Sequence, residues 1–266
     1  MFSHAGKGHF YCVDARLEYK WFVPDNSQPP PSSTVFVLLH EGLGCVSMWR
    51  QFPQLLAQRT GCSVLSYSRI GYGTSDSCQL PRPLDYMEIE ASRYLPEMVT
   101  GLDAENIFLL GHSDGASISA IYAADTPDPR VKGIILLAPH FFSEKISISA
   151  IKQARLAYVS GDLRQHLQLH HGDNVDCAFK GWNDAWLDPR FVHWNITHCI
   201  ADIAVPILVI QGLQDQYGSI AQVEIVQQQA RSPVEVCLLE QCRHAPHRDQ
   251  TIPTLDAIET FVCRSH

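Results

Sequence analysis

A serine lies between two glycines at the point where an apolar segment of the sequence ends. The apolar run NIFLL at 106–110 is followed directly by Gly111, His112, Ser113, Asp114 and Gly115. The pattern G-x-S-x-G between a strand and a helix is typical of a nucleophile held on a sharp turn. The glycines leave room for neighbouring backbone, and the serine must hold a strained conformation to expose its hydroxyl. The pattern predicts Ser113 as a catalytic nucleophile, the alternative being an ordinary tight turn.

Two further side chains follow predicted strands, in the chain order that such a nucleophile requires. A serine hydroxyl needs a base to remove its proton and an acid to orient that base. Asp215 follows a strand predicted at 206–212, and His244 follows one predicted at 234–240. We expect His244 to take the serine proton and Asp215 to stabilise the imidazolium that forms. His247 is the competing base or a pocket residue, and Asp215 could instead cap its loop.

Two backbone amides are expected to bind the oxyanion that forms when a serine attacks a carbonyl. One is the amide of Asp114, directly after the nucleophile. The other comes from the glycine-rich turn HEGLG at 40–44, where Leu43 or Gly42 can supply it. Glu41, in the same turn, is expected to be a loop carboxylate that faces solvent.

The carboxylate of Asp114 is a separate question, because a negative charge beside the nucleophile opposes the oxyanion unless it is paired or turned away. It could receive the ammonium group of a substrate. The alternative is a buried aspartate that is bonded to backbone amides or to an arginine.

The elements that must position these residues alternate between strand and helix, which indicates an α/β fold with a mostly parallel sheet and helices on both faces. Residues 10–23 read as a strand or hairpin, followed by a proline-rich loop at 24–34. Buried strands are predicted at 35–40, 62–68, 106–111, 131–139, 206–212 and 234–240. Helices are predicted at 48–61, 86–101, 116–125, 220–230 and 251–265. Such a sheet binds ligands at the carboxyl ends of its strands, where the candidate residues lie.

Residues 140–200 break this alternation, because strand patterns vanish and aromatic residues accumulate. We interpret 140–200 as a helical lid inserted into a core formed by 1–139 and 201–266. The lid aromatics are Phe141, Phe142, Phe179, Trp182, Trp186, Phe191 and Trp194. Trp182, Trp186, Phe141 and His247 are predicted to line a substrate pocket, although lid aromatics can instead attach a lid to its core.

With these motifs the chain resembles the α/β-hydrolase-fold superfamily of lipases and esterases over nearly its whole length. The resemblance rests on strands followed by HEGLG, SRIGYGTSD, GHSDG, QGLQDQY and QCRHAPH. It implies the α/β-hydrolase fold and a serine hydrolase that cleaves a small carboxylic ester or related acyl substrate through an acyl-enzyme, with no cofactor. Ser68 stands where members commonly carry aspartate, and Glu41 interrupts the usual HG dipeptide, so the exact donor amide stays open.

Three alternatives on the same fold stay open: a carbon–carbon bond hydrolase, a thioesterase, and a non-catalytic ligand receptor. The elbow also resembles the Ser-Asp-Gly-Gly of amino-acid ester hydrolases in this superfamily, with Ala116 in place of the last glycine. This local resemblance implies an ammonium-bearing substrate facing Asp114.

Composition excludes several other classes of protein. The 266 residues carry a net charge of −8, which argues against a nucleic-acid partner. We find no apolar segment of signal-peptide or membrane-span length, and the nine cysteines include no CxxC pair. We therefore expect a cytoplasmic protein with reduced thiols, a small-molecule acyl substrate, and neither membrane nor nucleic-acid partner; the oligomeric state is not predicted. The histidines at 166, 170 and 171 are expected on a solvated helix rather than at a metal site.

Overall fold

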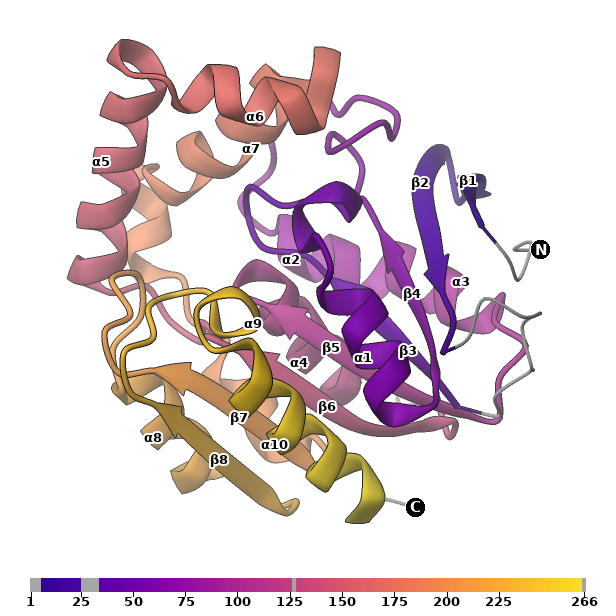
Figure 1. Cartoon of the computed structure of the whole chain (residues 1–266). Coiled ribbons are helices and arrows are strands. Elements are labelled where there is room, and N and C mark those ends of the chain that lie inside the picture. Colours follow the sequence, from indigo (N-terminus) through magenta and orange to yellow (C-terminus); the bar gives the residue numbers. More distant parts are fainter. Residues whose placement is uncertain (1–5, 25–33, 126–127, 265–266) are drawn as a thin grey trace.

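The computed structural model describes residues 6–24, 34–125 and 128–264, in which eight strands form one sheet (Figure 1). The strand order is β1-β2-β4-β3-β5-β6-β7-β8. β1 and β2 form an antiparallel hairpin, β2 is antiparallel to β4, and the remaining neighbours are parallel. The prediction of a mostly parallel sheet is therefore confirmed. The strands are β1 (Lys7–Cys12), β2 (Ala15–Phe22), β3 (Thr34–Leu39), β4 (Ser63–Tyr67), β5 (Asn106–His112), β6 (Val131–Leu137), β7 (Ile207–Gly212) and β8 (Val234–Leu239).

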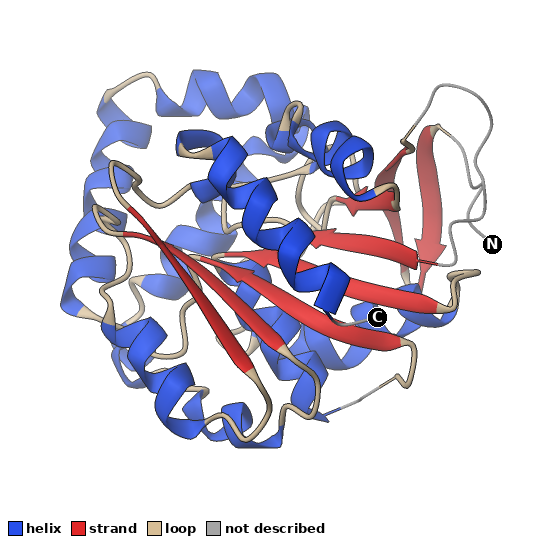
Figure 2. Ribbon diagram, turned by 60° about the horizontal axis from the view of Figure 1, so that its bottom comes forward, coloured by secondary structure: helices blue, strands red, loops and turns tan. Residues whose placement is uncertain are grey.

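Helices cover both faces of the twisted sheet (Figure 2). One face packs against α1 and α10, and the other against α4 and its neighbours. The α-helices are α1 (Phe52–Thr60), α2 (Tyr86–Ile89), α3 (Leu95–Thr100), α4 (Asp114–Asp125), α5 (Lys145–Ser160), α6 (Leu163–His171), α7 (Val175–Trp186), α8 (Ala221–Gln229), α9 (Pro246–Asp249) and α10 (Thr251–Arg264). The shorter elements are η1 (Val46–Trp49), the π turn η2 (Glu90–Tyr94), η3 (Gly172–Asn174), η4 (Pro189–His193) and η5 (Thr197–Asp202).

The alternation of side chains along each strand divides the apolar core between these two faces. Val37 of β3 packs in the larger cluster with α3 and α4, whereas its neighbour Phe36 packs in the cluster that holds Phe52 of α1 and Phe261 of α10. Successive side chains of a strand point to opposite faces, so a strand buried on both faces needs an unbroken apolar sequence. This requirement explains why TVFVLL forms a fully buried strand.

The helix predicted at 48–61 is interrupted. Arg50 has a backbone φ of +54°, which ends η1, and α1 begins only at Phe52 with a proline in its first turn. The helix predicted at 86–101 contains a π turn just before Pro96, which lacks the N–H needed for the next helical hydrogen bond. Apart from its two ends, the predicted loop 24–34 lies outside the described residues.

Residues 140–200 form α5, α6 and α7 with three 3-10 turns, and Figure 1 shows these helices grouped together on one side of the sheet. Aromatic side chains pack the group internally. The rings of Tyr158 in α5 and Phe179 in α7 stack with centroids 3.6 Å apart, and Trp186 in α7 packs against Phe191 and Trp194 at 4.9 and 5.6 Å. Much of the aromatic content of this segment therefore holds the helices to one another.

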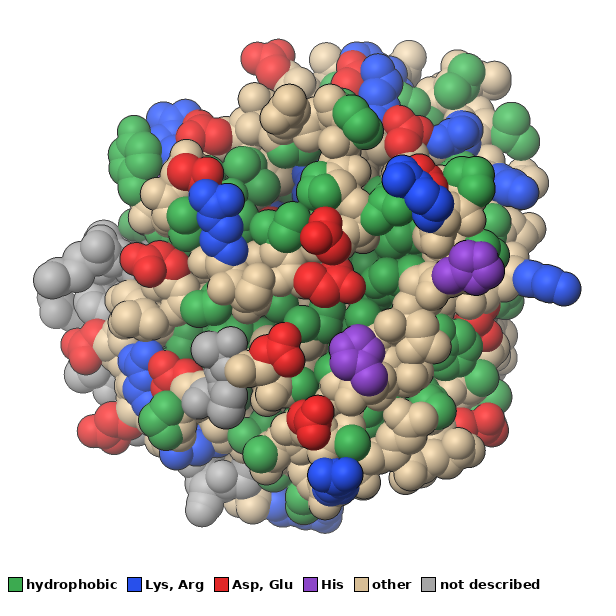
Figure 3. All heavy atoms as spheres, turned by 180° about the vertical axis from the view of Figure 1, so that it is seen from behind, with side chains coloured by type: hydrophobic (Ala, Val, Ile, Leu, Met, Phe, Trp, Pro, Cys, Tyr) green, Lys and Arg blue, Asp and Glu red, His purple; other side chains and the backbone are tan. Residues whose placement is uncertain are grey.

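Within the described ranges, no helix combines the length and apolar character that a membrane crossing needs. On the face seen in Figure 3, lysine and arginine side chains are interspersed with aspartate and glutamate. All nine cysteines are free thiols.

Candidate active site

Ser113 occupies the single residue between β5 and α4, with a backbone φ of +53°. This left-handed conformation is strained for a residue with a side chain. The two glycines are needed because the backbone on either side is crowded. A Cβ on Gly111 would lie 2.2 Å from the Gly115 oxygen, and one on Gly115 would lie 2.0 Å from the Leu39 oxygen. The predicted crowding and strain at this turn are therefore confirmed.

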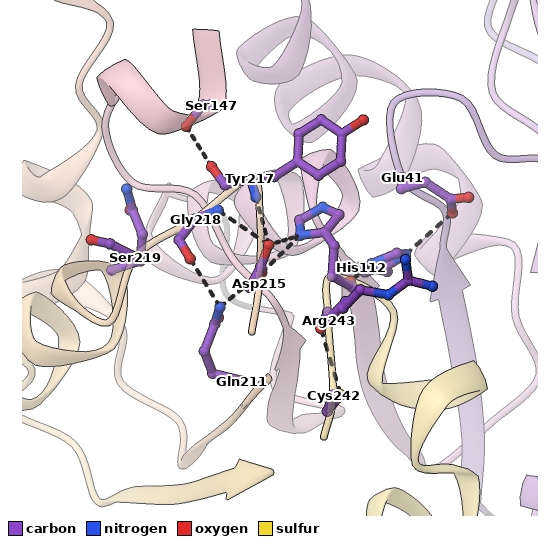
Figure 4. A network of polar contacts seen from close by, with 12 residues as sticks. Glu41, His112, Ser147, Gln211, Asp215, Tyr217, Gly218, Ser219, Cys242 and Arg243 are labelled. Atoms are coloured by element: carbon purple, nitrogen blue, oxygen red, sulfur yellow. Dashed lines mark hydrogen bonds and ion pairs between the residues drawn. The ribbon is translucent and has the colours of Figure 1, made fainter. Parts of the chain in front are cut away.

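Asp215 and His244 are hydrogen-bonded to each other at the carboxyl ends of β7 and β8. The Nδ1 atom of His244 lies 2.8 Å from Oδ2 and 2.9 Å from Oδ1 of Asp215. Gln211 donates to Oδ2, and the amides of Tyr217 and Gly218 donate to Oδ1 (Figure 4). The carboxylate is therefore fixed by four donors, which orients the imidazole ring.

These contacts keep the Asp215 carboxyl ionised. Burial alone would raise its pKa, but the hydrogen bond and charge of His244, together with the Tyr217 amide, lower the pKa to about 2. An ionised carboxylate on Nδ1 leaves Nε2 of His244 as the atom that can accept a proton.

Ser113 and His244 line one cavity of about 260 Å³, which Trp182 and Trp186 also line. Trp182 belongs to α7 and lies directly over the turn that follows β3, because a Cβ on Gly42 would lie 2.2 Å from its Cδ1 atom. The cavity therefore brings the predicted nucleophile and base together with two of the predicted pocket residues.

The turn after β3 presents backbone amides to the same cavity. The Gly44 amide donates to the Glu41 oxygen at 3.0 Å, so Gly42 and Leu43 are the central residues of a tight turn. Among the described residues the amides of Gly42 and Leu43 have no hydrogen-bond acceptor. Both residues and Asp114 line the cavity. Amides without acceptors beside a serine have the chemistry that an oxyanion needs.

Glu41 does not face solvent, contrary to expectation. Its side chain is 22% exposed, and its Oε2 atom lies 3.3 Å from Nδ1 of His112, the residue before Ser113. Nε2 of His112 lies 2.6 Å from the His244 carbonyl oxygen. Figure 4 shows Glu41 pointing toward His112. The prediction was wrong because the carboxylate finds a buried partner 71 residues away.

The charges of this pair stabilise each other. Burial would raise the pKa of Glu41, but the hydrogen bond and charge of His112 hold it well below its usual range. Burial would lower the pKa of His112, but Glu41 and the His244 carbonyl raise it above its ordinary value. A protonated His112 donates from both ring nitrogens and so ties the backbone of His244 to the turn that carries Glu41.

His140 is a cavity residue that the sequence analysis missed. It follows β6 at the same edge of the sheet, and its ring centroid lies 5.5 Å from that of His244. Burial first, and then the nearby charge of His244, lower its pKa to about 3, so its ring stays neutral. The signal was available, because His140 follows a predicted strand just as Asp215 and His244 do.

The Asp114 carboxylate is fully buried and already has partners. Tyr86 donates to its Oδ2 atom at 2.5 Å, Trp186 donates to the Tyr86 hydroxyl at 3.0 Å, and the buried Arg69 guanidinium lies 4.0 Å away. Burial raises the pKa of this carboxyl, whereas Arg69 and Tyr86 lower it. Since Trp186 belongs to α7, Asp114 connects the nucleophile turn to that helix through Tyr86.

Two predicted pocket residues lie elsewhere. Phe141 is fully buried in the larger apolar cluster and does not line the cavity. The ring of His247 packs against Trp49, Phe52 and His112, with centroids 4.9, 5.5 and 4.9 Å away. β8 ends at Leu239, and the turn after it brings His244 to Asp215. His247 lies three residues further on, in α9, where its ring faces α1 instead of the cavity.

The helix with three histidines is only partly solvated. His171 is buried, with its Nδ1 accepting from the Gly73 amide and its Nε2 bonded to the Leu43 oxygen, each at 3.0 Å. It therefore fastens α6 to the turn after β3, which corrects the expected solvated position. The described residues contain no cluster of three or more histidine, cysteine or acidic side chains placed to hold a metal ion.

Comparison with known proteins agrees with this architecture. WAV2 of Arabidopsis thaliana, an alpha/beta hydrolase domain-containing protein, is 24% identical over 198 residues, which are 74% of this chain and 58% of WAV2. A membrane phospholipase A, described as a bacterial virulence factor, superposes with a TM-score of 0.77 at 16% identity over 98% of this chain and 87% of its own. Proline iminopeptidase from Mycobacterium smegmatis gives 0.75 at 16% identity over 98% of each chain. These structural likenesses show the fold.

A family model described as the alpha/beta hydrolase family matches residues 36–256. The match covers most of the chain, including every residue proposed above for chemistry. It confirms the resemblance drawn from the motifs. The protein belongs to the alpha/beta hydrolase family.

Proposed function

We propose that the protein is a serine hydrolase that cleaves a small carboxylic ester or related acyl substrate through Ser113, His244 and Asp215. The observation that carries this proposal is the double contact between Asp215 and His244 at the cavity that Ser113 also lines. A partly buried imidazole that a carboxylate orients, in a cavity that a strained serine also lines, is an arrangement that a binding protein does not need.

In the proposed reaction, the Ser113 hydroxyl oxygen attacks the substrate carbonyl while Nε2 of His244 takes its proton. Asp215 stabilises the imidazolium, and the amide of Asp114 with that of Leu43 or Gly42 donates to the oxyanion. His244 then gives the proton to the leaving group, and an acyl-enzyme forms on Ser113. A water molecule activated by His244 hydrolyses this ester and restores the serine.

The shape of the cavity favours a small, mainly apolar acyl group. Leu163, Leu167 and Ile151 line the cavity beside Trp182 and Trp186, and its volume of about 260 Å³ is small for a ligand site. We propose that residues 140–200 act as a lid, since α5, α6 and α7 supply these side chains. Asp114 already has Tyr86 and Arg69 as partners, which favours a buried structural carboxylate over a site for a substrate ammonium group.

A fluorophosphonate probe tests the proposal, because it reacts only with an activated serine. We expect labelling at Ser113 that is abolished by Ser113→Ala and by His244→Ala. Ser119→Ala is the matched control, since Ser119 is buried on α4, the helix that follows Ser113, and its hydroxyl donates to the Gly115 oxygen at 2.8 Å.

A panel of nitrophenyl esters and thioesters then separates the alternatives. Turnover of esters supports the proposed substrate class, and faster turnover of thioesters favours a thioesterase. Absence of labelling together with absence of turnover would reject the enzyme and favour a ligand receptor.

A further inference from the structure

Two cysteines from distant parts of the chain meet where the helices of residues 140–200 touch the core. Cys78 lies in the loop between β4 and α2, and Cys177 lies in the first turn of α7. The Cys78 amide donates to Cys177 Sγ at 3.2 Å, and the Cys177 thiol donates to the Cys78 carbonyl at 3.4 Å. The two residues are 99 positions apart, so only the tertiary structure brings them together.

A glycine leaves the space in which the two sulfur atoms lie. A Cβ on Gly71 would stand 2.8 Å from Cys78 Sγ and 2.9 Å from Cys177 Sγ. Both sulfurs therefore border the same small volume, each within 3 Å of one point, so no other side chain lies between them at that point. Gly181, one turn after Cys177, allows a similar approach, because a Cβ there would lie 2.8 Å from Nε of Arg82.

Arg82 supplies a positive charge to this thiol pair. Its side chain is 8% exposed, and its Nη2 atom donates to Cys78 Sγ at 3.1 Å. Among the residues that the structure describes, no carboxylate oxygen lies within 4.0 Å of its guanidinium nitrogens. A buried guanidinium needs a counter-charge. The carboxylates of Glu90 and Asp114 act on Arg82 only from beyond contact distance, so a Cys78 thiolate would be the anion in direct contact with it.

The environment of Cys78 differs from that of the other buried thiols. The neighbouring Cys177 side chain, and then the charge of Arg82, lower the pKa of the Cys78 thiol against the opposing effect of burial. Burial instead raises the pKa of Cys12, Cys45 and Cys199. Cys78 is also half-buried, whereas Cys177 is buried, so Cys78 is the more accessible of the two to a small oxidant. A thiolate that is both stabilised and accessible reacts selectively with oxidants.

We propose that Cys78 and Cys177 form a peroxide-sensitive thiol pair whose oxidation joins α7 to the loop after β4 by a disulfide bond. The Cys78 thiolate attacks one oxygen of a hydroperoxide, the O–O bond breaks, and the departing oxygen takes up a proton as water or alcohol. The Cys177 thiol then loses its proton, and its sulfur attacks the sulfenic acid on Cys78. The S–S bond forms as the S–O bond breaks and water leaves. Two thiols are oxidised by two electrons, which the peroxide accepts.

The link would act on the helix that carries Trp182 and Trp186 over the cavity. Oxidation therefore ties α7 to the core and limits how far these side chains can move. This effect on turnover rests on the proposed function, whereas formation of the disulfide does not.

The test treats the full-length protein with hydrogen peroxide and maps thiols by mass spectrometry of an unreduced digest. We expect a cross-linked peptide pair that contains Cys78 and Cys177, about 2 Da lighter than the sum of the two reduced peptides and released by dithiothreitol. Cys177→Ser should stop the reaction at a sulfenic acid on Cys78, which dimedone traps. Cys263→Ser, which removes an exposed thiol on α10, is the control that should leave the cross-link unchanged.

Hydrogen exchange of residues 175–186 gives a second readout that does not depend on enzyme activity. Exchange in α7 should slow on oxidation of the wild type and stay unchanged in Cys177→Ser. Oxidation of other cysteines before Cys78, or a sulfinic acid on Cys78 with no cross-link, overturns the proposal. If the reduced wild type hydrolyses no ester, that result contradicts the proposed function but leaves the disulfide proposal intact.

Discussion

Replacing Asp215 by asparagine removes the charge that orients His244 while keeping the shape of the side chain. Two backbone amides, of Tyr217 and Gly218, donate to the Oδ1 position, so the oxygen of the new side chain must stay there. Its NH2 group then takes the Oδ2 position, which at 2.8 Å is the nearer of the two to Nδ1 of His244, the Oδ1 position being 2.9 Å away. Gln211 can rotate its amide to accept from that group, because its Oε1 atom has no partner among the described residues.

This substitution changes which ring nitrogen of His244 carries the proton. An NH2 group donates to Nδ1, which leaves the ring proton on Nε2, where it cannot accept the proton of Ser113. We expect kcat to fall roughly 10³–10⁴-fold, as expected when a serine hydrolase is left with the wrong tautomer.

The same substitution should also lower the free energy of unfolding, by a modest amount. The pKa of Asp215 falls from 3.8 to about 2 in the folded protein, which corresponds to a contribution of about 2 kcal/mol to the free energy of unfolding at neutral pH. Because this pKa is lowered, the contribution is present above pH 3.8 and is lost as the pH falls toward 2. Asp215→Asn should lose this contribution and its acid dependence.

The assay compares kcat on a nitrophenyl ester that the wild type hydrolyses with thermal unfolding of the same preparations. Glu144→Gln is the matched control, because Glu144 accepts from Ser219 in the loop before α8 and from Gln222 in α8, and no hydrogen bond of the described residues joins it to His244. It should lose stability and keep its rate. A folded Asp215→Asn protein with kcat within tenfold of the wild type would refute the reasoning.

Three further outcomes follow from the same site. Ser113→Gly should abolish ester turnover yet raise the free energy of unfolding by about 1 kcal/mol in urea titrations, since glycine relieves the strain at φ +53°; a loss of stability would contradict this. Glu41→Gln should destabilise most between about pH 4.5 and 6.5, the window above the ordinary pKa of Glu41 and below that of His112. As the pH rises through the raised pKa of His112, the wild type should lose the stability that protonated His112 contributes. A difference in Tm between the two proteins that does not change with pH would argue against an ion pair of Glu41 and His112. Asp114→Asn should lower kcat/KM equally for amino and non-amino esters, because its carboxylate is held by Tyr86; selective loss on amino esters would restore the ammonium site.

Local sequence predicted the elements of the fold and the three residues proposed for chemistry. Ser113 was identifiable because its two glycines, the strand before it and the helix after it are contiguous. Asp215 and His244 were identifiable because each directly follows a strand, and parallel strands bring their carboxyl ends to one edge. The interruption near Arg50 was not predicted, because a positive φ at a non-glycine residue leaves no pattern in the sequence.

The sequence by itself determined which segments form strands and helices and in what order polar residues leave the strands, because periodicity and turn chemistry act between near neighbours. Only the tertiary structure decided the partners. It paired Glu41 with His112, placed Tyr86 on Asp114, turned His247 away from the cavity and brought Cys78 to Cys177. Each of these contacts depends on the order of the strands in the sheet and on the direction in which a side chain points. The residues next to a contact in the sequence encode neither of these two properties.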